Sequence, residues 1–199
     1  MKLLFLVSLT MIAFATNSLL TRLAISTNSI DPANFALIRA VSATIILIII
    51  TVIINKKLPQ FKYKNIIAAF ALAGYLIGFS FAYLTIDTGI GALILFGGSM
   101  LVMFTGALIK KEQISFISFI GAILSLLGLY ILTDPRFSGN DLFGVILMLI
   151  AAFSWGIYSL LGHGQKNPLL NTTSNFILVL LLVITISIYI PKDIETSSY

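Results

Sequence analysis

The chain contains no cysteine and only one histidine, His163, among its 199 residues. The absence of cysteine excludes disulfide bonds, thiol catalysis, haem attachment and cysteine-based zinc sites. A single histidine also excludes a histidine-rich metal centre. We therefore expect neither a bound metal ion nor a cofactor.

Charged residues are scarce as well, at 10% of the sequence, whereas 59% of the residues are apolar. Soluble domains carry about 25% charged and 45–50% apolar residues, so this composition excludes a soluble domain. No phosphate-binding loop, HExxH motif or pair of carboxylates is present, which argues against an enzyme and gives no catalytic residue. No acidic residue lies deep in an apolar run, which favours facilitated diffusion or exchange over proton coupling.

Long apolar runs make up most of the chain, and each is close to the roughly 20 residues that cross a bilayer. They predict an all-α integral membrane protein with about seven transmembrane helices. The alternative for the first run is a cleaved signal peptide ending near Ala15. The seven predicted spans are Leu3–Leu23, Ala33–Ile54, Ile66–Ile86, Gly89–Ile109, Phe116–Leu132, Leu142–Gly162 and Thr172–Ile190.

The basic residues predict the orientation of these spans. If the N-terminus is cytoplasmic, eight of the 12 Lys and Arg residues lie inside and six of the seven acidic residues lie outside. An excess of Lys and Arg on the cytoplasmic side is the usual arrangement in membrane proteins. The net charge of +5 is thus explained by membrane orientation, and no nucleic-acid partner is expected.

A weak internal repeat relates the first two spans to the last two. Ala13-Phe14 corresponds to Ala152-Phe153, and Asn34–Leu37 corresponds to Asn175–Leu178. The offset of about 140 residues falls five spans later. Because five is odd, the second unit would be inverted in the membrane, as in many secondary transporters. We predict a first five-helix unit over residues 1–138 and an incomplete second unit of two helices over residues 139–199.

Several segments resemble the EamA-type proteins of the drug/metabolite transporter superfamily. The resemblance is carried by Phe14–Arg22, Ile30–Arg39, Gly91–Gly98 with Lys110-Lys111-Glu112, Gly121–Gly128 and Phe153–Gly156. It implies ten spans in two inverted repeats, both termini in the cytoplasm, and a central cavity that moves small metabolites by alternating access. It also implies that three spans are missing from this chain.

Arg39 is the strongest candidate for a substrate-binding residue. It follows Pro32 by seven residues, which is about 10 Å into a helix that rises 1.5 Å per residue. A charge at such depth usually faces a cavity or a partner, and an arginine there would bind a carboxylate or phosphate. The alternative is that its long side chain reaches the outer headgroups. The family resemblance adds that an arginine often stands at this position.

The remaining candidates each have a structural alternative. An amide such as Asn17 can join neighbouring helices by hydrogen bonds. Small residues at helical spacing, among them the Gly74-x-x-x-Gly78 motif, indicate helix packing, and aromatic stripes are often buried in a core. The predicted substrate-binding residues besides Arg39 are Asn17, Tyr75, Ser99, Trp155 and Tyr158.

We expect a transporter of amino acids or similar organic solutes in a bacterial inner (plasma) membrane. The expected partners are the lipid bilayer, the small-molecule substrate, and either a second copy or the missing C-terminal helices. The alternative function is a non-transporting membrane subunit that needs a partner to complete its helix bundle.

Overall fold

The computed structural model describes residues 2–26, 30–57, 59–134 and 141–189. These residues form seven α-helices, each long and apolar enough to cross a membrane, which confirms the all-α membrane fold. The helices are α1 (Lys2–Ser26), α2 (Pro32–Asn55), α3 (Tyr63–Ala82), α4 (Thr88–Ile109), α5 (Phe116–Thr133), α6 (Leu142–Gly162) and α7 (Pro168–Tyr189).

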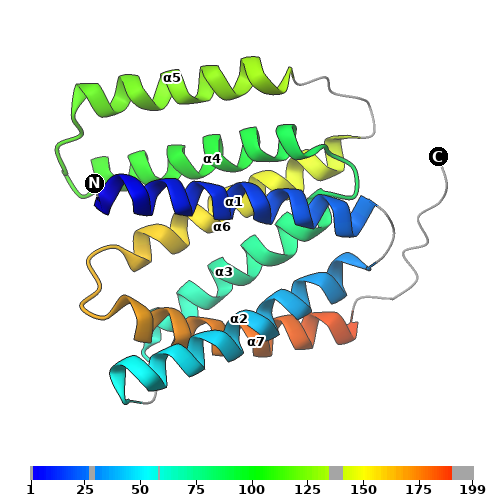
Figure 1. Cartoon of the computed structure of the whole chain (residues 1–199), viewed down its shortest axis with the longest axis vertical. Helices are drawn as coiled ribbons and strands as arrows, with labels where there is room; N and C mark the ends of the chain where they lie inside the picture. The colour runs from blue at the N-terminus through cyan, green and yellow to red at the C-terminus, as the bar shows by residue number, and fades with distance from the viewer. Residues whose placement is uncertain (1, 27–29, 58, 135–140, 190–199) are drawn as a thin grey trace.

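The helices run along a common direction, so the bundle has two ends (Figure 1). The lysine-rich end holds the start of α1 and the α2–α3, α4–α5 and α6–α7 connections. The acidic end holds the α1–α2 and α3–α4 connections and the start of α6. The orientation predicted from the charges puts the lysine-rich end in the cytoplasm.

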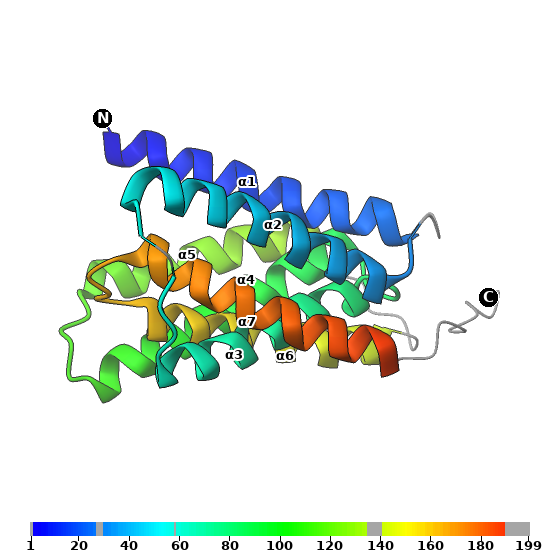
Figure 2. The ribbon, with the colours of Figure 1, turned by 90° about the horizontal axis from the view of Figure 1, so that it is seen from below.

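Helix α3 forms the centre of the packing. It contacts α2, α6 and α7, and α6 in turn packs against α4. Most of the membrane-length stretch of α3 is buried, whereas α5 has no buried residue and lies at the edge of the bundle (Figures 1 and 2). The large exposed apolar side chains of α1, α2 and α5 are suited to contact with lipid hydrocarbon.

Glycines bring α3, α4 and α6 into close contact. A Cβ atom at Gly78 would lie 2.8 Å from the Leu147 carbonyl oxygen, and one at Gly74 would lie 2.7 Å from the Ser154 Oγ. A Cβ atom at Gly98 would lie 2.8 Å from the Ala152 Cβ. Small residues at such interfaces allow membrane helices to approach one another. The packing interpretation of Gly74-x-x-x-Gly78 is therefore confirmed.

Helices α2 and α7 run antiparallel and are joined by hydroxyl groups. The Thr44 Oγ1 donates a hydrogen bond of 3.2 Å to the Phe176 carbonyl, and the hydroxyls of Thr51 and Thr173 are 2.6 Å apart. Both threonines of the second pair are fully buried. Hydrogen bonds of this kind hold transmembrane helices together where water is absent.

Two predicted helix boundaries were wrong. Helix α3 ends at Ala82 rather than Ile86, because the Tyr83 carbonyl accepts a hydrogen bond from Arg22 and the chain turns toward α4. Helix α7 begins at Pro168 rather than Thr172, because the Asn167 side chain caps it by accepting from the Leu170 N–H at 3.2 Å. An Asn-Pro pair here starts the helix as Asp31-Pro32 starts α2. The predicted end of this span at Ile190 lies outside the described residues.

Small residues also stand at helical spacing in α5, at Ser118, Gly121, Ser125 and Gly128, which predicts a packing seam, but in the described part of the chain they form none. Cβ atoms built at Gly121 and Gly128 would meet no atom within 4 Å. Glycine at helical spacing permits a close contact but does not create one. Only the arrangement of the neighbouring helices decides whether the contact forms.

Candidate functional site

A cleft of about 600 Å³ lies between five helices in the middle of the bundle. Residues of α1, α2, α3, α6 and α7 line it. A volume of this size falls within the range of small-molecule sites. Its lining residues are Thr10, Ala13, Phe14, Asn17, Arg39, Ser42, Ala43, Leu72, Tyr75, Leu76, Trp155, Tyr158, Thr172 and Phe176.

Arg39 supplies the positive charge of the cleft. Its guanidinium carbon lies 5.1 Å from the ring centre of Phe79, 5.7 Å from that of Phe35 and 5.8 Å from that of Tyr75. Its Nη1 donates to the Ser80 Oγ at 3.3 Å. These contacts hold the side chain without neutralising it, since aromatic faces attract a cation but carry no net charge. Among the described residues, Arg39 makes no ion pair with a carboxylate.

Aromatic rings form the wall facing this charge. The Tyr75 and Trp155 rings are 4.8 Å apart, and those of Trp155 and Tyr158 are 5.6 Å apart. Phe14 of α1 meets the Trp155 ring edge-on at 5.9 Å. The Asn17 Nδ2 donates to the Tyr75 hydroxyl at 3.5 Å, which brings an amide from α1 next to a phenol from α3.

Five of the six predicted substrate-binding residues line this one cleft: Arg39, Asn17, Tyr75, Trp155 and Tyr158. Ser99 does not. It is buried in α4, where its Oγ donates to the Phe96 carbonyl at 3.2 Å, and its own carbonyl faces Gly156 of α6. Ser99 thus takes part in helix packing, which was the alternative interpretation. Whether the other five bind a solute stays a prediction.

The sequence analysis did not select the other nine lining residues, among them Phe14, Thr172 and Phe176. For Phe14 a signal was available. Thr10, Phe14 and Asn17 are spaced i, i+4 and i+7, so they share one face of α1. Thr172 and Phe176 are four residues apart on α7 and share a face in the same way. Choosing that face required knowing which side of α7 meets the cleft.

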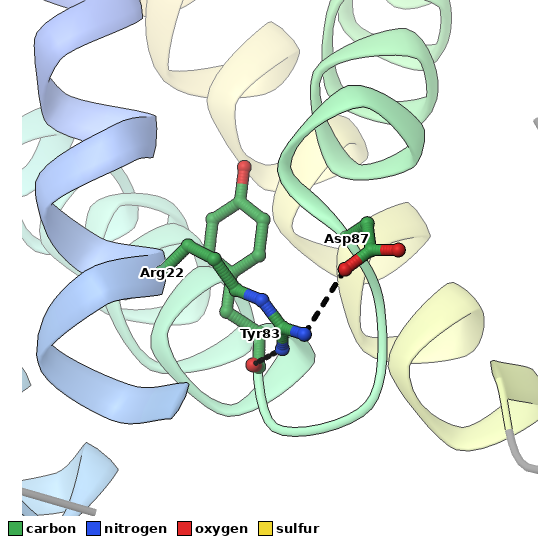
Figure 3. Close-up of polar contacts among 3 residues, drawn as sticks. All are labelled: Arg22, Tyr83 and Asp87. Carbon is green, nitrogen blue, oxygen red and sulfur yellow. Dashed lines mark hydrogen bonds and ion pairs between the residues drawn. The ribbon is translucent and has the colours of Figure 1, made fainter. Parts of the chain in front are cut away.

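At the acidic end, an ion pair ties α1 to the turn between α3 and α4 (Figure 3). The Arg22 Nη2 lies 3.0 Å from the Asp87 Oδ1, and the Arg22 Nη1 donates to the Tyr83 carbonyl at 2.6 Å. The side chains of Tyr83, Phe79 and Ile25 beside this pair are fully buried. The sequence analysis did not identify the pair, because its members are 65 residues apart.

At the lysine-rich end, a second cavity of about 370 Å³ lies between α3, α6 and α7. Lys62, Lys64 and Asn65 line one side of it, and the ends of α6 and α7 line the other. Tyr158 and Thr172 line both this polar cavity and the central cleft. The two spaces are therefore neighbours along the direction of the helices.

Apolar helices of membrane length around a cleft with one uncompensated charge are typical of membrane transport proteins. The sequence profile of the EamA-like transporter family matches residues 1–134. The chain belongs to the EamA-like transporter family.

Curated relatives agree with this family. The chain is 35% identical to uncharacterized protein PA1977 of Pseudomonas aeruginosa, over 85% of this chain and 58% of that protein. It is 22% identical to an uncharacterized transporter of Archaeoglobus fulgidus, over 79% of this chain and 58% of that protein. It is also 28% identical to the uncharacterized transporter YdfC of Bacillus subtilis, over 64% of this chain and 43% of that protein. The chain thus spans about half the length of these relatives. No solved structure is significantly similar to it.

Proposed function

We propose that the chain carries the solute-binding cleft of a transporter that moves small organic metabolites across a bacterial inner membrane by alternating access. The observation that carries the proposal is Arg39, a partly buried cation in a 600 Å³ cleft with no carboxylate partner among the described residues. A charge kept in an apolar setting without a counter-charge is expected to serve a ligand.

The chemistry of the cleft favours a solute that combines an anionic group with an apolar body. A guanidinium binds a carboxylate through two parallel hydrogen bonds. The rings of Tyr75, Trp155 and Tyr158 offer apolar surface, and Asn17 offers an amide near the Tyr75 hydroxyl. Amino acids and similar carboxylates meet these requirements.

The described contacts also support a direction of access. Toward the acidic end, the helices meet through Phe79, Tyr83 and the Arg22–Asp87 pair. Toward the lysine-rich end, the cleft adjoins the polar cavity. With the N-terminus in the cytoplasm, this conformation is open toward the cytoplasm and closed toward the outside.

Uptake of a panel of radiolabelled amino acids into proteoliposomes tests the proposal. Arg39→Gln is expected to abolish uptake, and Arg39→Lys to keep only part of it, because an ammonium cannot bind a carboxylate in the bidentate manner. Lys110→Gln is the matched control, since it also removes one positive charge and Lys110 lines neither the cleft nor the contacts at the acidic end. Uptake by Arg39→Gln at the unsubstituted rate, with equal membrane insertion, would contradict the proposal.

One observation favours the second candidate function, a membrane subunit that needs a partner. Cβ atoms built at Gly121 and Gly128 of α5 would meet no atom within 4 Å, so this helix face leaves room for a further helix. If the purified chain binds a carboxylate solute in an Arg39-dependent way but transports none, the subunit function is the better account.

A further inference from the structure

We infer that the polar cavity at the lysine-rich end is a second anion-binding site, separate from Arg39, which takes a phosphate or carboxylate group. The binding itself does not depend on the proposed transport function. The idea that the transported solute binds this site on the cytoplasmic side of the cleft does rest on that function. Two features of the cavity lining support the inference: its charged residues are lysines, and most of its amide oxygens already accept hydrogen bonds.

The charged lining of the cavity is entirely basic. Among the described lining residues, Lys62 and Lys64 carry charge and no aspartate or glutamate is present. Neither lysine forms an ion pair with a described carboxylate. Two ammonium groups at one mouth raise the local concentration of anions by several-fold or more when low-dielectric walls surround the space.

The floor of the cavity is built from amides whose oxygens are already in use. The Asn65 Oδ1 accepts from the Lys62 N–H at 2.8 Å, and the Asn65 Nδ2 donates to the Asn175 Oδ1 at 2.7 Å. Both asparagines are buried. The two hydrogens of the Asn175 Nδ2 make no hydrogen bond to a described residue, so they can donate to a group in the cavity.

On the opposite side of the cavity, the Asn171 Nδ2 donates to the Gln165 Oε1 at 3.0 Å and to the Asn167 carbonyl at 3.1 Å. The Asn171 Oδ1 is the one lining amide oxygen that accepts from no described residue. Three of the four lining amides, those of Asn65, Asn175 and Gln165, therefore have an oxygen that accepts from within the protein. The lysine ammonium groups and the Asn175 amide hydrogens remain as donors. Such a lining favours a ligand rich in acceptors, which is the property of phosphate and carboxylate groups.

The position of the cavity connects it to the central cleft. Tyr158 lines both spaces, and its ring is 5.6 Å from that of Trp155. An anion held by Lys62 and Lys64 would lie on the path between the lysine-rich surface and Arg39. Trp155 is the only tryptophan in the chain, so its fluorescence reports on this region alone.

Titration of the purified full chain with inorganic phosphate, followed through Trp155 fluorescence, tests the inference. Sodium chloride at matched ionic strength removes general salt effects. We expect a saturable change, with the Kd raised about tenfold or more in Lys62→Gln/Lys64→Gln because charge-assisted hydrogen bonds are lost. The control pair is Lys57→Gln/Lys110→Gln, which removes two lysines from the same end that do not line the cavity.

Three results would overturn the inference: no saturable change, an equal loss in both lysine pairs, or a loss in Arg39→Gln that Lys62→Gln/Lys64→Gln does not share. Nanodiscs distinguish the source of the anion. Competition by phosphatidylglycerol, absent with phosphatidylcholine, identifies a lipid headgroup, whereas equal phosphate binding in both identifies a free anion. Either result keeps the site.

The binding assay is independent of the transport assay. If uptake depends on Arg39 but phosphate binding does not depend on Lys62 and Lys64, only the second site is wrong. If the lysine-dependent binding is present and uptake is absent, the proposed function is wrong and the second site stands.

Discussion

The two ends of the helix bundle differ in how their polar groups are used. At the acidic end, the Arg22–Asp87 pair and the Tyr83 carbonyl hold α1 against the α3–α4 turn, beside fully buried aromatic side chains. At the lysine-rich end, basic residues surround a cavity and have no described acidic partner there. The Arg22–Asp87 pair at the acidic end joins two helices, whereas Lys62 and Lys64 at the other end make no ion pair with a described carboxylate.

This difference shows that composition alone does not decide what a charged residue does in a membrane protein. Arg22 and Arg39 both follow apolar stretches, yet one has a carboxylate partner and the other has aromatic faces. The partner is what separates a structural cation from a candidate binding cation. Substitutions that weaken one end at a time separate the two kinds of cation.

The largest expected effect comes from filling a glycine at the acidic end. In Gly144→Ala, the new Cβ would meet Thr85, the Ala82 carbonyl oxygen at 2.7 Å and Ile86 at 2.8 Å. Overpacking against a backbone atom costs about 1–3 kcal/mol. We expect a lower Tm in detergent, by about 2–4 °C for each kcal/mol.

Gly162→Ala is the matched control in the same helix. It lies at the lysine-rich end, and its Cβ would meet no atom within 4 Å. Its Tm is expected to stay equal or rise slightly, since alanine is the better helix former. Equal destabilisation by both substitutions would show that the two ends are packed alike.

A smaller effect is expected from the buried amide pair that forms the floor of the polar cavity. Asn65→Leu leaves the Asn175 Oδ1 without its donor, and Asn175→Leu leaves the Asn65 Nδ2 without its acceptor. Interhelical hydrogen bonds in membranes average about 0.6 kcal/mol by double-mutant cycles. A cycle measured by thermal unfolding should give a coupling of that order, and a coupling of zero would mean that the bond does not join α3 to α7.

The smallest effect on stability is expected from the ion pair at the acidic end. The Asp87 side chain is 78% exposed, so the pair is largely screened by solvent. Exposed pairs contribute about 0–1 kcal/mol, and Asp87→Asn should change Tm little. Arg22→Ala should cost more, because it also removes the bond to the Tyr83 carbonyl. Equal Tm values for the two variants would show that this second bond contributes nothing.

The helix count and five of the residues that line the cleft could be predicted from the sequence, because apolar length defines a span and a charged, polar or aromatic residue inside a span needs a partner or a cavity. Arg39, Asn17, Tyr75, Trp155 and Tyr158 were chosen on one-dimensional features, and they line one cavity. Each of these five residues is a polar, charged or aromatic residue within an apolar span. Such residues need a partner or a cavity wherever the helix lies.

The features that were missed depend on long-range pairing. The partner of Arg22 is separated from it by 65 residues, and the Asn65–Asn175 bond spans 110. Ser99 is the one predicted residue that does not line the cleft, and a small hydroxyl on a glycine-rich face fits a packed interface as well as a binding site. Without the relative rotation of α4 and α6, the sequence cannot distinguish the two.

In the proposed function, the cleft is reached from the lysine-rich end and is closed at the acidic end. Because the chain has no cysteine, single cysteines can be labelled with a membrane-impermeant maleimide in vesicles of known orientation. Asn171→Cys, which lines the polar cavity, should be labelled from the lysine-rich side. Ser18→Cys, only 3% exposed, should stay unlabelled from both sides until Arg22→Ala is added. Labelling of Ser18→Cys from the acidic side with Arg22 intact, together with protection of Asn171→Cys, would contradict the claim.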